Sequence, residues 1–105
     1  MKNIKIELQY FKGCPNSEKA MDMVRRFVAE SELQIDYEEI LVETQEDAEK
    51  YKFRGSPTIL INGKDIEDLE ESRTPSLSCR YYQNGLPNNE NLNNYINSLL
   101  ENRKK

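Results

Sequence analysis

The sequence predicts a single α/β domain over residues 1–105, with strands and helices in the order β-α-β-α-β-β-α. Three observations predict this fold class. Residues 4–10 alternate apolar and polar side chains, as a strand with one buried face does. Residues 15–28 instead place their apolar side chains at helical spacing. An apolar run at 58–61 then meets Asn62-Gly63, a strong signal for a hairpin between two strands.

The first strand leads into the first helix through a cysteine. Pro15 suits the first position of a helix, where a missing backbone N–H costs nothing, so the helix is predicted to begin there. Cys14 is then its N-cap residue. Ala20, Val24 and Phe27 mark the buried side of this helix, and charged residues occupy the other side.

A second strand and a short helix follow. Residues 33–42 carry apolar side chains in a strand-like pattern. Thr44, with Asp47 three residues later, resembles a capping box, in which a side chain accepts a hydrogen bond from the first turn of a helix. This helix is predicted to stop at Gly55.

The C-terminal part contains one further helix. After the hairpin, residues 67–76 are polar and are predicted to be irregular. Residues 77–83 are predicted to form another extended segment. A closing helix is predicted after Pro87-Asn88, because apolar residues recur at helical spacing over 92–100.

The composition excludes several kinds of chemistry. The chain has two cysteines and no histidine, so it can build neither a Ser-His-Asp triad nor a Cys-His nucleophile pair. Two cysteines cannot supply the four thiolates of an ordinary structural zinc site. No apolar run approaches the roughly 20 residues that cross a bilayer, and the N-terminus lacks the apolar stretch of a signal peptide. We therefore expect no metal, no cofactor, no membrane contact and a cytoplasmic location.

Charge is distributed unevenly along the chain. Residues 30–71 carry fourteen acidic and four basic side chains, whereas the remainder carries five acidic and eleven basic ones. The acidic stretch argues against general nucleic-acid binding, which relies on basic surface to neutralise phosphates. We interpret it as solvated surface that keeps a small protein soluble.

The chemistry of Cys14 depends on its place at a helix N-terminus. Unpaired backbone N–H groups and the positive end of the helix dipole favour a thiolate there and lower the thiol pKa below its usual value of about 8.5. Lys12 and Lys19 add positive charge nearby, and the Ser17 hydroxyl can turn toward the same sulfur. Cys14 could instead be an inert residue that fills a turn. Its position favours the reactive interpretation.

The segment Gly55-Ser56-Pro57-Thr58 directly precedes an apolar strand. A proline that opens a strand is tolerated because the hydrogen-bond ladder has barely begun. On its own this segment indicates an ordinary turn, since few X–Pro bonds are cis.

Together, these features resemble the thioredoxin fold superfamily, and the resemblance covers essentially the whole chain. The chain is similar in particular to a group of small prokaryotic thioredoxin-like proteins. The segments that carry this likeness are Tyr10-Phe11-Lys12-Gly13-Cys14-Pro15-Asn16, Phe53-Arg54-Gly55-Ser56-Pro57-Thr58-Ile59 and Leu77-Ser78-Cys79-Arg80-Tyr81-Tyr82. The resemblance implies a glutaredoxin-sized mixed sheet flanked by helices and a cis Ser56–Pro57 bond, with Pro57 close to Cys14.

The same resemblance implies the residues of a site. Cys14 would be the nucleophile of a Cys-Pro-Asn-Ser motif, and Pro57 would shape the substrate groove. The residues assigned to catalysis are Cys14, Ser17, Pro57 and Cys79, and those assigned to the groove are Pro15, Asn16, Ser56 and Thr58.

Two departures from the family pattern matter. Ser17 stands where the second cysteine is expected, so a dithiol cycle cannot run within the motif. Monothiol glutaredoxins have such a Cys-x-x-Ser motif and work through a glutathione mixed disulfide. Their Gly-Gly-Asp-like element after the hairpin is replaced here by Ile66-Glu67-Asp68-Leu69, whose acids would repel the carboxylates of glutathione. The use of glutathione stays open.

Cys79 has two interpretations. It is either a structural cysteine on an extended segment or a remote resolving thiol that attacks a mixed disulfide on Cys14. The second interpretation requires a Cα separation of about 4.4–6.8 Å, which spacing along the chain does not determine. Arg80 could promote a thiolate at Cys79, or it could pair with an acid of residues 65–71.

Three hypotheses of function follow. The leading one is a thiol–disulfide oxidoreductase that exchanges with a protein or small-molecule thiol or disulfide. The second is a binding module that keeps the fold but lacks turnover and captures a partner beside Pro57. The third is soft-metal capture by Cys14 and Cys79, since soft thiolate ligands select soft metals. The sequence leaves open whether the protein is an enzyme.

Overall fold

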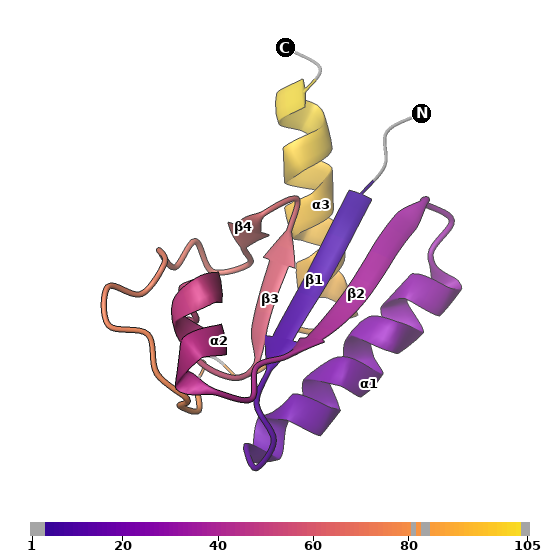
Figure 1. The fold of residues 1–105 in the computed structure, drawn as a ribbon. Coiled ribbons are helices and arrows are strands. Elements are labelled where there is room, and N and C mark those ends of the chain that lie inside the picture. The colour runs from indigo at the N-terminus through magenta and orange to yellow at the C-terminus, as the bar shows by residue number, and fades with distance from the viewer. Residues whose placement is uncertain (1–3, 81, 83–84, 104–105) are drawn as a thin grey trace.

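The structure is a computed structural model that describes residues 4–80, 82 and 85–103. Its elements are β1 (Ile4–Tyr10), α1 (Pro15–Glu30), β2 (Ile35–Leu41), α2 (Gln45–Tyr51), β3 (Thr58–Ile61), β4 (Lys64–Asp65) and α3 (Asn89–Arg103) (Figure 1). The predicted α/β class and the predicted order of elements are confirmed.

The four strands form one mixed sheet in the order β2-β1-β3-β4. The central strand β1 pairs in parallel with β2 and antiparallel with β3, and β4 pairs antiparallel with β3. Helix α1 makes the long connection that two parallel strands need. Asn62 and Gly63, with φ values of 52° and 83°, make the predicted two-residue turn between β3 and β4.

The two faces of the sheet carry separate apolar clusters. The main core joins β1 and β3 to α1 and α3, and its buried residues are Ile4, Ile6, Leu8, Ala20, Val24, Phe27, Ile59, Ile61, Leu92 and Ile96. A smaller cluster around α2 contains Val42, Ala48 and Phe53, with Ile40 packed against it. Ile40 pairs with Gln9. Because side chains alternate along a strand, Gln9 points to the face opposite that of Leu8, which belongs to the main core. Helix α2 therefore covers the face opposite α1 and α3.

This topology brings two loops together at one end of the sheet. Gln9, near the end of β1, pairs with Thr58, the first residue of β3. Because these strands are antiparallel, the loop after β1 lies beside the segment that precedes β3. The first loop carries Cys14, and the second carries Ser56 and Pro57.

Local signals start the first and last helices. Cys14 is the N-cap of α1, and Pro15 is its first residue, as predicted. At the start of α3, the Asn88 N–H donates to the Asn91 side-chain oxygen, and the Asn91 N–H donates to the Asn88 side-chain oxygen, both at 2.9 Å. This reciprocal pair satisfies two backbone donors that a helix start leaves unpaired.

Helix α2 starts as predicted but ends earlier. Thr44 Oγ1 accepts a hydrogen bond from the Asp47 N–H at 3.0 Å, which confirms the predicted cap. The prediction that this helix runs on to Gly55 is wrong. It ends at Tyr51, and Lys52 caps it in the left-handed conformation with a φ of 51°.

The region between β4 and α3 is irregular. Residues 67–76 form neither helix nor strand, as predicted. The predicted extended segment at 77–83 forms no strand among its described residues, and it makes a single parallel bridge between Ser56 and Cys79. Residues 81 and 83 of that prediction lie outside the described residues. Within the described ranges, no helix is long and apolar enough to cross a membrane.

Candidate functional site

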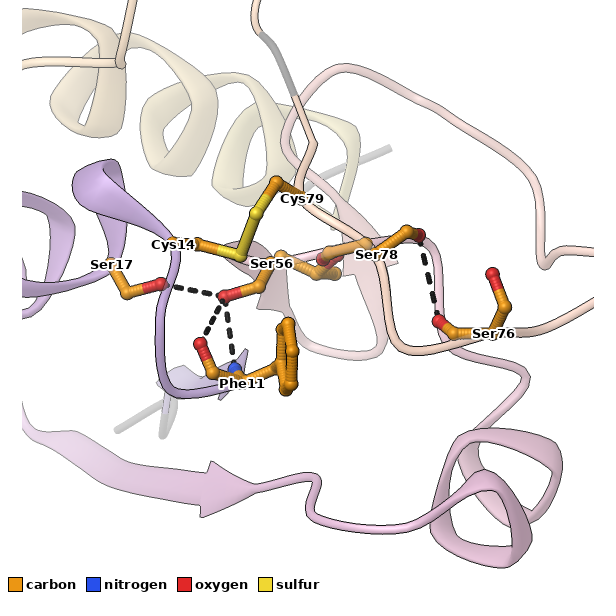
Figure 2. The surroundings of a disulfide bond; sticks show 9 residues. Phe11, Cys14, Ser17, Ser56, Ser76, Ser78 and Cys79 are labelled. Atoms are coloured by element: carbon orange, nitrogen blue, oxygen red, sulfur yellow. Dashed lines mark hydrogen bonds between the residues drawn. A yellow bond between two sulfur atoms is a disulfide. The ribbon is translucent and has the colours of Figure 1, made fainter.

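A disulfide bond joins Cys14 to Cys79 (Figure 2). The two residues are 65 positions apart in the sequence, and their Cα atoms lie 5.6 Å apart. This separation falls within the range that a disulfide requires. The geometric condition for Cys79 to act as a resolving thiol is therefore met.

Cys14 sits at the junction of β1 and α1. The residue is only 6% exposed, and the turn before it passes through Gly13, whose φ is 103°. As N-cap, Cys14 faces the first turn of α1, where its carbonyl accepts a hydrogen bond from the Ser17 N–H at 3.2 Å. When the disulfide is reduced, a Cys14 thiolate at this helix end is favoured by the helix dipole.

In the disulfide state the Ser17 side chain is directed at Ser56. Its hydroxyl lies 2.6 Å from the Ser56 hydroxyl, and the expected hydrogen bond to a Cys14 thiolate stays a prediction for the reduced protein. Ser56 Oγ also accepts a hydrogen bond from the Phe11 N–H at 2.9 Å, and Figure 2 shows the two hydroxyls directed at each other. Because Ser17 and Ser56 are buried, this network fixes the loop after β1 against the loop before β3.

The backbone of Ser56 holds the segment that contains Cys79. The Ser56 N–H donates to the Ser78 carbonyl at 2.9 Å, and the Arg80 N–H donates to the Ser56 carbonyl at 2.8 Å. These two bonds make the parallel bridge between Ser56 and Cys79. Both polar backbone groups of Ser56 are thus hydrogen-bonded to residues 78 and 80 of the same chain.

The residues around Pro57 are also covered. The Ser56–Pro57 peptide bond is cis, and the Pro57 carbonyl accepts a hydrogen bond from the Tyr82 hydroxyl at 2.8 Å. Thr58 Oγ1 donates to the Gly55 carbonyl at 2.6 Å. Ser56 and Thr58 have no exposed surface, so they offer none to a partner in this oxidised state. Of the other two residues assigned to the groove, Asn16 is half-buried and Pro15 occupies the first position of α1.

Arg80 pairs with an acid of the 65–71 run, the second of the two alternatives above. Its guanidinium binds both Asp65 carboxylate oxygens, at 2.6 and 2.8 Å, and lies 4.4 Å from the centre of the Tyr82 ring. Both charged residues are buried, with 7% of Arg80 and 3% of Asp65 exposed. Burial alone would raise the Asp65 pKa, but hydrogen bonds from Arg80 and from backbone N–H groups lower it below its usual range.

A cavity of about 510 Å³ lies beside the disulfide. It is lined by Tyr10, Lys12, Gly13, Cys14, Ser17, Glu18 and Met21. Such a volume is in the range of small-ligand sites. Sequence reasoning assigned Met21 no place at the site, because helical spacing also suits a core position.

The described residues offer few metal ligands. Among them, no group of three or more histidine, cysteine, aspartate or glutamate side chains is placed to hold a metal ion. The two sulfurs of Cys14 and Cys79 are bonded to each other in this state. The chemistry that this arrangement supports directly is exchange between a disulfide and two thiols.

A four-stranded mixed sheet flanked by helices, with a cysteine at the N-terminus of the first helix, is the arrangement of a thioredoxin-like protein. A family model described as "Thioredoxin domain" matches residues 2–66. Because this match covers more than half of the chain, the chain belongs to the thioredoxin domain family. No curated protein matches the chain. The matched region contains Cys14 and Pro57 but ends before Cys79 and Arg80.

Proposed function

We propose that the protein is a thiol–disulfide oxidoreductase whose working pair is Cys14 and Cys79. One observation carries this proposal. Cys14 occupies the helix N-terminus of a thioredoxin domain, and it is bonded to a cysteine that a backbone bridge to Ser56 holds opposite it. Cys79, held by this bridge, supplies from a distant segment the second thiol that Ser17 cannot supply within the motif.

The oxidised protein accepts two electrons in two exchange steps. A partner thiolate attacks the Cys14 sulfur, a mixed disulfide forms, and Cys79 leaves as a thiolate that takes up a proton. A second partner thiolate then attacks the partner sulfur of this mixed disulfide. The partner disulfide forms, and Cys14 leaves as a thiolate. The reverse sequence reduces a partner disulfide and restores the Cys14–Cys79 bond.

The surroundings of Cys14 support its role as the sulfur that exchanges with the partner. The N-terminus of α1 stabilises the thiolate that is released or that attacks. The cavity lined by Tyr10, Lys12 and Met21 borders Cys14, whereas the flank at Ser56 is filled by residues 78–80. We propose that the partner, a protein or small-molecule thiol or disulfide, approaches from the cavity.

The proposed location is the cytoplasm. Thiol systems keep most cytosolic cysteines reduced, and the disulfides that form there are usually transient and catalytic. A Cys14–Cys79 pair that cycles between two states fits this pattern better than a purely structural bridge does.

A redox titration tests the function. The protein is equilibrated with reduced and oxidised dithiothreitol at several ratios, free thiols are trapped by alkylation, and mass spectrometry counts them. We expect a two-thiol transition, and we expect Cys14 to alkylate faster than Cys79 at pH 6, where only a lowered pKa leaves much thiolate. Faster alkylation of Cys79 would reverse the assigned roles.

Trapping variants separate the two cysteines. Cys79→Ser should accumulate a mixed disulfide on Cys14, whereas Cys14→Ser, the matched control, should accumulate far less on Cys79. A disulfide that never equilibrates with dithiothreitol would contradict an oxidoreductase and favour the binding module. Stoichiometric retention of a soft metal by the reduced protein, without any exchange activity, would favour metal capture.

A further inference from the structure

The exchange cycle leaves one feature unused. Arg80 and Asp65 are a buried ion pair, and two charges tolerate removal from water only when their geometry is good and their other hydrogen bonds are made. Arg80 directly follows Cys79 in the sequence, and its pairing with Asp65 joins the Cys79 segment to the last residue of β4. We therefore asked what this ion pair does beside Cys79.

The contacts of Arg80 and the backbone bridge of Cys79 to Ser56 together anchor the Cys79 segment, and they are separate from the disulfide. Arg80 is held by two hydrogen bonds to Asp65, by a third contact with Glu67 at 3.4 Å and by the Tyr82 ring. The backbone bridge to Ser56 lies on the other side of the same residues. None of these contacts involves either sulfur atom, so breaking the S–S bond does not itself break any of them.

The segment that leads to Cys79 needs such an anchor. From β4 to Cys79 the chain forms neither helix nor strand, and an irregular connection allows its end to sample many positions. A thiol that is held near its target reacts as if it were present at high concentration. The anchor therefore decides how often Cys79 meets Cys14.

We infer that Arg80 is a positioning residue that, through Asp65, keeps Cys79 docked beside Ser56 after the disulfide is reduced. This inference rests on the proposed function. In the docked state the Cys79 thiolate attacks a mixed disulfide on Cys14: the Cys14–Cys79 bond forms, the bond to the partner breaks, and the partner leaves as a thiolate that takes up a proton. The partner disulfide is the oxidant.

Arg80 acts here through position and not through its charge. Its guanidinium is bound to the Asp65 carboxylate, and both charges are satisfied by that pair. An effect on the Cys79 thiolate would require the guanidinium to face the sulfur. We therefore expect changes at Arg80 to alter the closing equilibrium of the disulfide while leaving the pH dependence of Cys79 alkylation unchanged.

The test measures the closing equilibrium against dithiothreitol in three proteins. Arg80→Met with Asp65→Asn removes both charges together, which avoids a lone buried charge. The asparagine side chain can still accept from the Glu67 and Leu69 N–H groups that now bind Asp65. Arg25→Met is the matched control, because it breaks an exposed ion pair with Glu39 far from the site. We expect the double variant to lower the equilibrium constant for disulfide formation by about tenfold or more and the control to leave it unchanged.

Amide hydrogen exchange in the reduced wild-type protein tests the docking without any variant. The Ser56 N–H, which donates to the Ser78 carbonyl, should remain protected after reduction and should lose at least about tenfold of that protection in the double variant. A Ser56 amide that exchanges freely in the reduced wild type overturns the inference. So does an unchanged equilibrium constant in a folded double variant. If the wild type never equilibrates with dithiothreitol, the proposed function fails, whereas amide exchange in Cys14→Ser, which cannot form the disulfide, still decides the docking.

Discussion

Gly55 shows how the absence of one side chain brings two distant segments together. Its φ is 110°, a conformation that residues with a Cβ atom rarely adopt. A Cβ at this position would lie 2.8 Å from the Arg80 Cβ, closer than van der Waals contact allows. Gly55 therefore permits the close approach on which the hydrogen bonds between Ser56 and residues 78–80 depend.

Gly55→Ala should lower the free energy of unfolding by about 2 kcal/mol or more, because backbone strain and the contact with Arg80 both oppose the added methyl group. Gly13→Ala is the matched control. Its φ of 103° imposes a similar strain, but nothing lies within 4 Å of the added Cβ. Urea unfolding of both variants separates the two causes, and equal losses would contradict the steric role of Gly55.

Ser17→Ala should affect stability more than reactivity. The Ser17 hydroxyl is bonded to Ser56 within a buried network, so its loss should lower the free energy of unfolding by about 1 kcal/mol. The alkylation rate of Cys14 at pH 6, measured on reduced protein, should change by less than about twofold. Ser98→Ala, an exposed change on α3, serves as control. A much slower alkylation would mean that the hydroxyl turns to the sulfur upon reduction.

At the scale of elements, the helices, strands and turns that were predicted correctly are those whose signals lie within a few neighbouring residues. The alternation in β1, the proline at the start of α1 and the Asn62-Gly63 turn each act within a few residues, and each was predicted correctly. The end of α2 was missed because Lys52 adopts the left-handed conformation before the chain reaches Gly55, the residue predicted to end the helix.

Long-range pairing explains the other errors. Among the described residues of 77–83, the backbone makes a bridge to Ser56, and nothing in the sequence of this segment reveals a partner so far along the chain. The sequence left two roles open for Arg80. It could act on its neighbour Cys79 or pair with an acid of residues 65–71, and the local sequence pattern favours neither. The hairpin that places Asp65 beside Arg80 decides between them.

The buried pair between β4 and the Cys79 segment should give stability a defined pH dependence. The Asp65 pKa is lowered in the folded protein, so the pair stabilises fully above the unfolded-state pKa of about 3.9 and loses this contribution as pH falls through the lower folded value. Urea unfolding between about pH 2 and pH 6 should therefore show a steeper acid loss in the wild type than in Asp65→Asn. Glu39→Gln removes a carboxylate that is less deeply buried than Asp65 and whose pKa is also lowered, and it should have a smaller effect because its partner Arg25 is exposed and such pairs are weak. Parallel curves for the wild type and Asp65→Asn would contradict this role.

At the scale of the whole molecule, the site combines a family feature with one beyond the family match. Residues 2–66 supply Cys14, the cis-proline loop and the Asp65 anchor point. The chain after residue 66 supplies Cys79 and Arg80, and it folds back over the loop to place the second sulfur. A distant segment thus places a second sulfur at Cys14, and the docking of that segment uses the Ser56 backbone N–H and carbonyl groups.

This arrangement links redox state to global stability. The disulfide joins residues 65 positions apart, and the chain-entropy treatment assigns a loop of that length about 4 kcal/mol of constraint on the unfolded chain. By thermodynamic linkage, the gap in unfolding free energy between oxidised and reduced protein equals the difference in disulfide-forming tendency between the folded and the unfolded chain. Docking of Cys79 favours disulfide formation in the folded chain but not in the unfolded one. The Arg80–Asp65 anchor should therefore increase the difference in unfolding free energy between oxidised and reduced protein.

The oxidised wild type should therefore be more stable than the reduced wild type, by up to about 4 kcal/mol. In the Arg80→Met, Asp65→Asn double variant this gap should shrink by about 1.4 kcal/mol for every tenfold loss in the closing equilibrium with dithiothreitol. Urea unfolding of both redox states of both proteins measures the two gaps by linear extrapolation. The two experiments must agree, because they are two sides of one thermodynamic cycle. A shrinking gap with an unchanged equilibrium constant would place the effect in the unfolded chain, and Arg80 would then have no part in holding Cys79 at Cys14.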